Sequence, residues 1–223
     1  MKYLKIDELI HNNEQWINEK LKDDKDYFKK LSAGQSPRYL MISCSDSRVP
    51  LNSLLKAEPG EIFIHRNIAN QVNQNDINLL SVLEFSLEHL FIRHIIIVGH
   101  YGCGGVSASI DNLDQGLIEN WVAPIKDIFM KNSSELNSLK DKKELTDKLA
   151  ELNAVEQAKN IIKTPVYQRA LRKRKFPIVH AWIFDIYTGK IIKKDINEDK
   201  LIKDGILPDF YLEHIETNKT YYE

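Results

Sequence analysis

Cysteine is scarce in this chain, which has two in 223 residues, Cys44 and Cys103. Two thiols are too few for a disulfide framework. The chain also lacks an apolar run long enough to span a bilayer, and residues 1–7 lack the features of a secretory signal. We therefore expect a cytoplasmic protein. In a reducing compartment, two thiols are more often buried, catalytic or metal-bound than joined to each other.

An excess of either charge is missing as well. Lys and Arg number 31, Asp and Glu number 32, and the formal net charge is −1. Such a balance gives no overall field to attract nucleic acid or an anionic membrane. The basic run at 172–175 falls at an expected helix end, where cations complement the helix dipole. We expect a small-molecule substrate, with no nucleic acid and no membrane partner.

Apolar runs of strand length alternate with helical patterns along the chain. Strands are predicted at 39–43, 61–65, 95–98, 177–186 and 190–196, and helices at 6–31, 76–93 and 116–174, with a weak helix after Pro208. The long helical stretch is expected to break at Pro124 and to restart at Thr164 and Pro165. This order predicts an α/β fold with a central, mostly parallel β-sheet flanked by helices and an antiparallel edge strand. We expect an N-terminal helical arm at 1–34 and a single α/β domain at 35–223.

Polar residues follow two of the predicted strands at the point where each strand ends. Cys44 ends one apolar run and precedes the polar residues 45–48, whereas His100 and Cys103 lie among the glycines that follow another. In parallel sheets, ligands gather at the carboxyl ends of strands. Two neighbouring strands would therefore bring together three zinc-compatible ligands, one short of a tetrahedron. The fourth position is where we expect the function.

These residues have other interpretations. A buried cysteine is often only a small hydrophobic residue, but the polar run after Cys44 and the glycines around Cys103 make poor core material. The glycine-rich turn could cradle phosphate, yet its spacing fits neither the dinucleotide nor the Walker pattern. Cys44 and Arg48 are too close in sequence for the phosphate loop of a thiolate-based phosphatase. A metal site is the best interpretation.

Three segments resemble the signature segments of the β-class carbonic anhydrases, of the bacterial type: CSDSRV at 44–49, RNIAN at 66–70 and GHYGCGG at 99–105. The likeness extends to 35–37, to 58–61 and to the helical segment with Asn120, Trp121 and Ile125. It implies a lyase that hydrates carbon dioxide reversibly to bicarbonate and a proton. It also implies a cytoplasmic homodimer or homotetramer whose N-terminal helices embrace a neighbouring subunit.

The resemblance further implies a zinc ion, Zn2+, held by Cys44, His100 and Cys103, with zinc-bound hydroxide as the nucleophile. Water or Asp46 would take the fourth place. Paired with Arg48, Asp46 could accept the hydroxide's proton and aim its lone pair at carbon dioxide. Released from Arg48, Asp46 could move onto zinc and close the site. A surface ion pair of little consequence is the plainer alternative for this dyad.

By the same resemblance, Gln35, Phe63 and Phe85 would line the substrate pocket, and the backbone amide of Gly104 would face the substrate. On composition alone, both phenylalanines could be ordinary core residues. Two other functions stay open: a zinc hydrolase acting on carbon disulfide or carbonyl sulfide, and a non-catalytic zinc-binding family member. The presence of Asp46 and Arg48 disfavours the second.

Some enzymes of this family bind bicarbonate in a second pocket through Trp, Arg and Tyr. Arg66 is retained here, but Met41 and Phe184 occupy the positions that match Trp and Tyr. Both replacements lack the hydrogen-bonding group, so we expect weaker regulation by bicarbonate. Away from these motifs, His180 lies inside an apolar strand and is expected to be a hydrogen-bonded core histidine.

Overall fold

The computed structural model describes residues 3–111, 116–174 and 177–219, and the chain divides into two compact units, Met1–Ser36 and Pro37–Glu223. The first unit contains α1 (Ile6–Asp23) and α2 (Tyr27–Ser32). Edge-on contacts join the rings of Trp16, Tyr27 and Phe28 across these helices. Neither helix has a fully buried residue.

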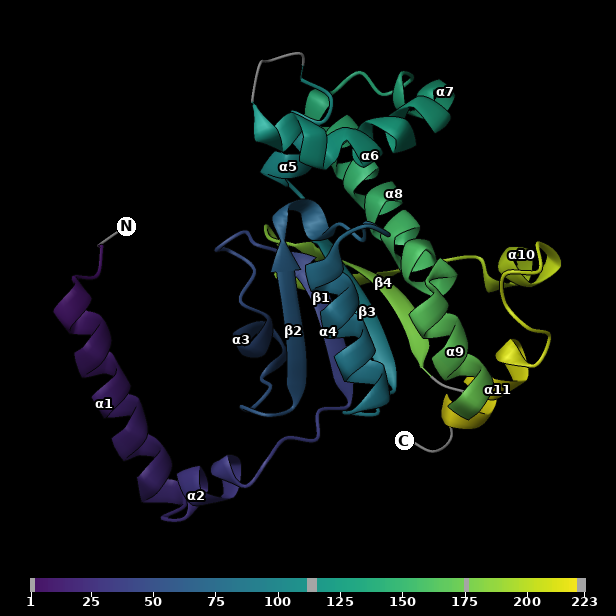
Figure 1. Cartoon of the computed structure of the whole chain (residues 1–223). Coiled ribbons are helices and arrows are strands. Elements are labelled where there is room, and N and C mark those ends of the chain that lie inside the picture. The colour runs from purple at the N-terminus through teal and green to yellow at the C-terminus, as the bar shows by residue number, and fades with distance from the viewer. Residues whose placement is uncertain (1–2, 112–115, 175–176, 220–223) are drawn as a thin grey trace. The chain divides into compact units, whose positions relative to one another are not determined.

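The second unit is built on a five-stranded sheet in the order β2-β1-β3-β4-β5 (Figure 1). Its strands are β1 (Tyr39–Cys44), β2 (Ile62–Asn67), β3 (His94–His100), β4 (Ile178–Asp185) and β5 (Lys190–Lys194). The first four are parallel, and β5 pairs antiparallel with β4 at the edge. The predicted mostly parallel sheet with an antiparallel edge strand is therefore confirmed.

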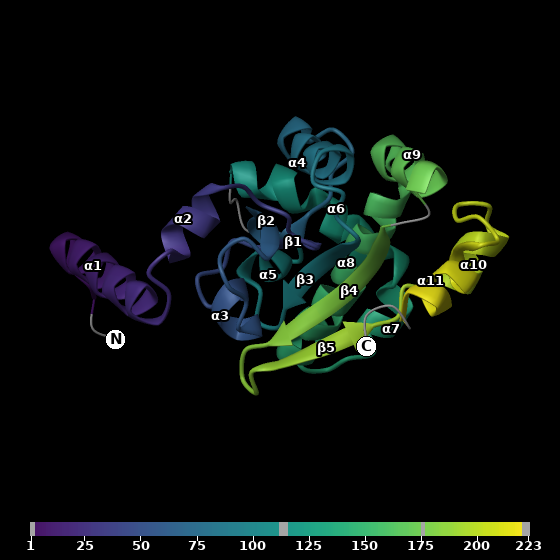
Figure 2. The ribbon, with the colours of Figure 1, turned by 90° about the horizontal axis from the view of Figure 1, so that it is seen from below.

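Helices cover the two faces of this sheet unequally. One face packs against α4 (Ile77–Glu88), α8 (Lys142–Lys163) and α9 (Pro165–Arg174), whereas α3 (Leu51–Leu55) lies on the other (Figure 2). β-branched residues dominate the central strand β3, as a strand covered on both faces requires. The remaining elements are η1 (Ile68–Asn70), α5 (Gly104–Ala108), α6 (Leu117–Lys131), α7 (Ser133–Leu136), α10 (Glu198–Lys203) and α11 (Tyr211–Lys219).

Helix α8 approaches the sheet closely because small residues meet at the contact. A Cβ atom on Gly99 would lie 2.9 Å from the Ile183 side chain and 3.3 Å from the Ala154 Cβ. Ala150, Ala154 and Ala158 are all buried along the same helix. The close approach places side chains of α8 directly beneath the loops that follow β2 and β3.

Several boundaries differ from the sequence-based expectation. Pro124 lies inside α6 and does not interrupt it, because the buried face of Val122, Ile125 and Ile128 stabilises the helix despite the lost backbone hydrogen bond. The expected restart is present: α9 begins at Pro165, and the Thr164 hydroxyl accepts a hydrogen bond from the Tyr167 amide. Helix α4 ends at Glu88, earlier than expected. Among the described residues, no helix is long and apolar enough to cross a membrane.

Candidate metal centre

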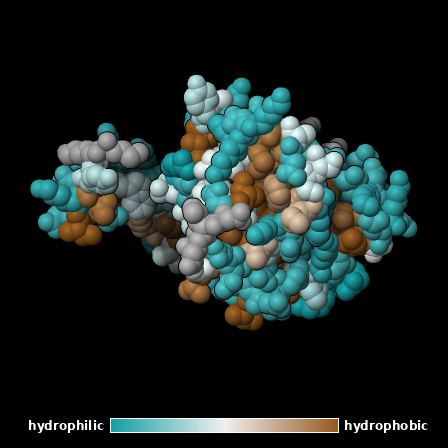
Figure 3. All heavy atoms as spheres, turned by 90° about the horizontal axis from the view of Figure 1, so that it is seen from above, coloured by the Kyte–Doolittle hydropathy of each residue, from teal (hydrophilic) through white to brown (hydrophobic). Residues whose placement is uncertain are grey.

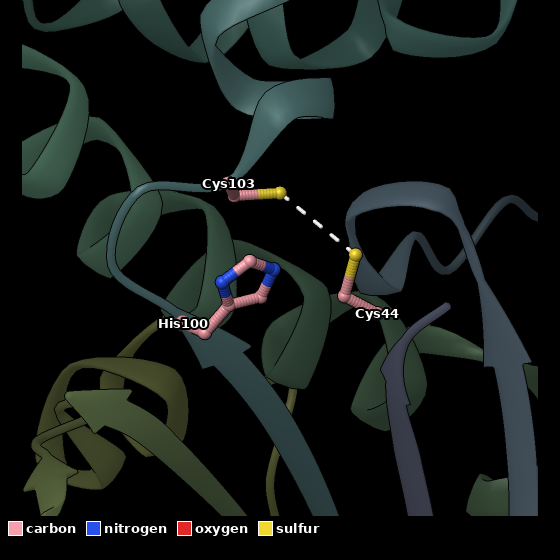
Figure 4. Close-up of side chains that lie close together, drawn as sticks. All are labelled: Cys44, His100 and Cys103. Atoms are coloured by element: carbon pink, nitrogen blue, oxygen red, sulfur yellow. Dashed lines mark hydrogen bonds between the residues drawn. The ribbon is translucent and has the colours of Figure 1, made fainter. Parts of the chain in front are cut away.

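Cys44 and His100 are the last residues of two adjacent parallel strands, β1 and β3. Cys103 follows three residues after His100, immediately before α5. Donor atoms of the three residues all lie within 4.8 Å of one another, and all three residues are buried. Figure 4 shows the imidazole of His100 directed toward the space between the two sulfur atoms. The strand ends thus bring together the three residues singled out in the sequence.

The two nitrogens of His100 have different surroundings. The Nδ1 atom lies 2.9 Å from the Tyr101 carbonyl oxygen. Because a carbonyl oxygen only accepts, Nδ1 carries the ring proton and donates a hydrogen bond to that oxygen. The Nε2 atom is buried and has no hydrogen-bond partner among the described residues. A buried nitrogen lone pair without a partner costs free energy unless another group binds it. A metal ion is such a group.

The sulfur atoms of Cys44 and Cys103 are 3.9 Å apart. In a tetrahedral zinc site with zinc–sulfur bonds of about 2.3 Å, two sulfur ligands lie about 3.8 Å apart. The hydrogen bond between the two sulfur atoms lowers the pKa of the Cys44 thiol, and the same interaction together with burial raises the pKa of Cys103. The donor set and its spacing fit zinc.

Asp46 lies beside these donors and forms a bidentate ion pair with Arg48. The Arg48 Nε atom donates to Asp46 Oδ1 at 2.9 Å, and Nη2 donates to Oδ2 at 2.6 Å. These hydrogen bonds hold the pKa of the Asp46 carboxyl well below its usual range. Asp46 Oδ2 is also 3.7 Å from His100 Nε2. A permanent carboxylate therefore stands next to the donor atoms, with both oxygens bound by Arg48.

Two arginines hold the backbone around the ion pair of Asp46 and Arg48. The Arg66 guanidinium donates to the carbonyl oxygen of Cys44, at 2.6 and 3.0 Å, and to that of Asp46 at 2.8 Å. Arg48 Nη2 also donates to the Gly102 carbonyl oxygen at 3.2 Å. Arg48 thus connects the loop after β1 with the loop after β3.

Helix α8 supplies contacts that the sequence did not reveal. Asp147 accepts a hydrogen bond from the Gly102 amide at 3.0 Å, and Glu151 accepts one from the Tyr101 hydroxyl at 2.6 Å. Lys194 of β5 forms an ion pair with Glu151 at 2.8 Å. The two residues between His100 and Cys103 are therefore both held by one helix. The only sequence signal was two acidic residues four apart, on one face of a helix.

The residues expected to line the substrate pocket do not all lie near the metal donors of this chain. Phe63 and Phe85 lie together, with ring centroids 6.0 Å apart. Phe63 pairs with Leu40, four residues before Cys44 along β1, or about 13 Å at the usual strand rise. The chain therefore does not bring these two rings to its own metal donors. Gly104 directly follows Cys103 and faces open space, and Gln35 is exposed in the first unit.

A hollow of about 440 Å³ lies against Ser45, the residue that follows Cys44. Its lining consists of Ser45, Asn67, Ile68, Leu117, Ile118 and Trp121. The Trp121 indole donates to the Ile68 carbonyl oxygen at 2.8 Å, which connects α6 with the turn after β2. Leu117 is 87% exposed and Ile68 44%. Figure 3 shows hydrophobic residues, in brown, among the hydrophilic ones on the face seen from above. The hollow therefore has a mostly apolar lining.

A parallel sheet with two cysteines and one histidine at its carboxyl edge defines an α/β protein with a candidate metal site. The family model described as carbonic anhydrase matches residues 39–191. The chain is 42% identical over 193 residues to the carbonic anhydrase of Emericella nidulans, covering 86% of this chain and 84% of the relative. It is 34% identical to that of Candida albicans, covering 87% of this chain and 70% of the relative. The chain belongs to the carbonic anhydrase family, in its β class.

Solved structures agree with this family assignment. The β-carbonic anhydrase CafA of Aspergillus fumigatus superposes with a TM-score of 0.86 at 33% identity, covering 93% of this chain and 99% of that one. A structure from work on two tetrameric β-carbonic anhydrases of Sordaria macrospora gives a TM-score of 0.80 at 35% identity, covering 83% and 94%. The Coccomyxa enzyme, solved with acetazolamide, gives 0.83 at 29%, covering 97% and 99%.

Proposed function

We propose that this chain hydrates carbon dioxide reversibly to bicarbonate and a proton, using one zinc ion per chain held by Cys44, His100 and Cys103. The observation that carries the proposal is the buried His100 Nε2 atom, without a partner among the described residues, beside two thiols and an ionised carboxylate. When bound, zinc supplies an activated water for attack on carbon dioxide. Two thiolates neutralise its charge, so activity should rise toward alkaline pH.

Asp46 is proposed to orient the attacking water. Arg48 keeps it ionised through two short hydrogen bonds, so it can accept a proton in a hydrogen bond from that water. A second proposed role is that Asp46, once released from Arg48, moves onto the metal and closes the site. Both of its oxygens accept hydrogen bonds from Arg48, which supports the first of these roles.

Phe63 and Phe85 are proposed to line a substrate pocket that a second copy of the chain completes. Phe85 is 45% exposed, and Phe63 lies on β2, the edge strand of the sheet. If a second copy of the chain packs on this edge, the two rings of one copy would lie against the metal donors of the other. The backbone amide of Gly104, next to Cys103, is proposed to face the substrate, and the assignment of Gln35 to the pocket stays a prediction.

An oligomer follows from this pocket. We propose a homodimer or a dimer of dimers, which the tetrameric Sordaria enzymes support by analogy. Light scattering of the purified protein tests it: a monomer at micromolar concentration would contradict it. We also propose a cytoplasmic location, because Cys44 and Cys103 are both free thiols.

Stopped-flow hydration of carbon dioxide across pH, combined with metal analysis, tests the proposed function. The expected result is zinc-dependent turnover that increases with pH and is inhibited by acetazolamide, the ligand of the Coccomyxa enzyme. Assays with carbon disulfide and carbonyl sulfide separate the sulfur-compound hydrolase. A zinc-loaded protein inactive on all three substrates would be a non-catalytic family member and would contradict the proposal.

Regulation by bicarbonate is proposed to be weak. Met41 and Phe184, which stand where regulated enzymes have Trp and Tyr, pack in one apolar cluster and are nearly fully buried. Neither offers a hydrogen bond to bicarbonate. Steep inactivation by bicarbonate would contradict this.

A further inference from the structure

The turn between β2 and α4 has an unusual backbone. Ala69 and Asn70 both have positive φ angles, of 60° and 47°, although neither is glycine. The left-handed conformation is unfavourable for L-residues. Such conformations persist where the surrounding structure holds them in place, and they concentrate at functional sites.

The left-handed conformation directs one backbone group toward the metal donors. The Ala69 amide donates a hydrogen bond to Cys44 Sγ, with nitrogen and sulfur 3.4 Å apart. The residue before the turn, Asn67, pairs with Cys44 in the sheet, so the turn begins beside that sulfur. Ala69 is completely buried, so water does not replace this donor.

A buried amide side chain from α8 holds the other side of Ala69. Asn153 is 1% exposed, and its Nδ2 atom donates to the Ala69 carbonyl oxygen at 3.0 Å. The same oxygen accepts a second hydrogen bond, from Gln71 Nε2 at 3.1 Å. The Asn153 Oδ1 atom accepts hydrogen bonds from Gln71 at 3.0 Å and from Gln157 at 2.9 Å. Gln157 in turn accepts a hydrogen bond from the Val72 amide at 2.8 Å. Both lone pairs of Asn153 Oδ1 are thus used, which fixes the orientation of its amide.

Helix α5 closes the turn from the opposite direction. A Cβ atom at Gly105 would lie 2.7 Å from the Ile68 side chain and 3.0 Å from the Ala69 Cβ. Ala69 is therefore confined between α5 and the amide of Asn153, with little freedom to rotate its peptide groups away from the sulfur.

We propose that Asn153 is a positioning residue of the metal centre: by holding the Ala69 carbonyl, it keeps the amide of the same residue directed at the Cys44 sulfur. The inference rests on the metal site of the proposed function. A hydrogen bond to a thiolate withdraws electron density from the sulfur and stabilises its charge. Asn153 therefore tunes how strongly Cys44 donates to the bound metal, although it touches neither the metal nor the substrate.

The direct test uses the protein loaded with cadmium-113. An amide that donates to a metal-bound sulfur shows scalar coupling between its proton and the metal nucleus, and we expect this coupling at Ala69. A protein that binds no cadmium at Cys44, His100 and Cys103 contradicts the proposed metal site and this inference together. A protein that binds cadmium but shows no coupling at Ala69 contradicts this inference alone.

The variant Asn153→Asp tests the positioning role. It keeps the size and the acceptor oxygen of the side chain but removes the Asn153 donor, so that Gln71 Nε2 is the donor that remains on the Ala69 carbonyl oxygen. The expected results are loss of the coupling, about 10- to 100-fold weaker zinc binding in a chelator competition, and a charge-transfer band of the cobalt-substituted protein at longer wavelength. A folded Asn153→Asp protein with wild-type values in all three measurements overturns the proposal.

Gln168→Glu is the matched control, because the Gln168 amide also donates to two backbone carbonyls, those of Ile162 and Ile206, but away from the metal. It should lower thermal stability without changing the metal measurements. If Asn153→Asp does not fold, Gln157→Met replaces it, since it removes one donor to Asn153. A smaller loss of coupling and of zinc affinity is then expected, and wild-type values in both contradict the role of Asn153.

Discussion

Strand β3 carries one histidine at each end, and the two have opposite surroundings. At the carboxyl end, His100 is fully buried and has an Nε2 atom without a partner among the described residues. At the amino end, His94 Nδ1 lies 3.0 Å from His180 Nε2, and the His94 ring stacks on Tyr39. The same side chain on the same strand is thus a candidate metal donor in one place and a packing residue in the other. What decides between these roles is whether the ring nitrogens already have partners.

The largest predicted effect separates these two histidines. His100→Gln should abolish the bound zinc and the zinc-dependent activity, because a neutral amide is a poor substitute for imidazole in a zinc site. The matched variant His94→Gln, six residues earlier on the strand, should retain the full zinc content. Metal analysis of both purified proteins measures the difference. Equal zinc content in the two variants would show that the contrast is wrong.

The next effect concerns turnover without loss of metal. Asp46→Asn removes the charge that Arg48 holds beside His100 but leaves Cys44, His100 and Cys103 in place. Turnover should fall by roughly 10²- to 10⁴-fold, the usual contribution of a positioned proton acceptor, with zinc content unchanged. Asp185→Asn, which alters a carboxylate that caps an exposed turn, is the control. Full turnover of Asp46→Asn with an unchanged pH profile would rule out both proposed roles of Asp46.

A smaller effect is expected in the loop after His100. Tyr101→Phe removes the hydroxyl that donates to Glu151 and leaves the backbone carbonyl that accepts from His100. The loss of one hydrogen bond to a charged acceptor should lower the free energy of unfolding by about 1.5–3 kcal/mol. Glu151 keeps Lys194 as a partner. Thermal unfolding of the zinc-loaded protein measures this. An unchanged melting temperature would argue that the hydrogen bond between Tyr101 and Glu151 contributes nothing to stability.

The smallest effect is expected at the amino end of β3, and only in acid. Burial lowers the pKa of His180 to about 4 and also lowers that of His94. Unfolding returns both to about 6.5, so the unfolded chain binds protons more readily. The stability that the neutral rings contribute is complete above pH 6.5 and is lost as the pH falls toward 4.

His180→Phe should therefore reduce the loss of stability between pH 6.5 and 4 by roughly 1–3 kcal/mol. Urea unfolding of the variant and the wild type across this range measures it. A parallel pH dependence of the two proteins would contradict the assignment of acid sensitivity to this pair.

The sequence was sufficient to predict the convergence of the metal donors, because Cys44 and His100 each end an apolar run and parallel strands align their carboxyl ends. It could not predict that the α6 helix continues through Pro124, because tertiary burial of the helix outweighed the local penalty of proline. The role of Asn153 was also hidden. A lone amide in a helix gives no local sign that it is buried or that it faces a turn 84 residues away.

The central claim is that two sulfur atoms and one imidazole nitrogen bind a single zinc ion. X-ray absorption at the zinc edge of the purified, zinc-loaded protein tests it most directly. The account predicts two sulfur neighbours at about 2.3 Å and a nitrogen or oxygen shell at about 2.0 Å. A zinc shell of nitrogen and oxygen alone would contradict it.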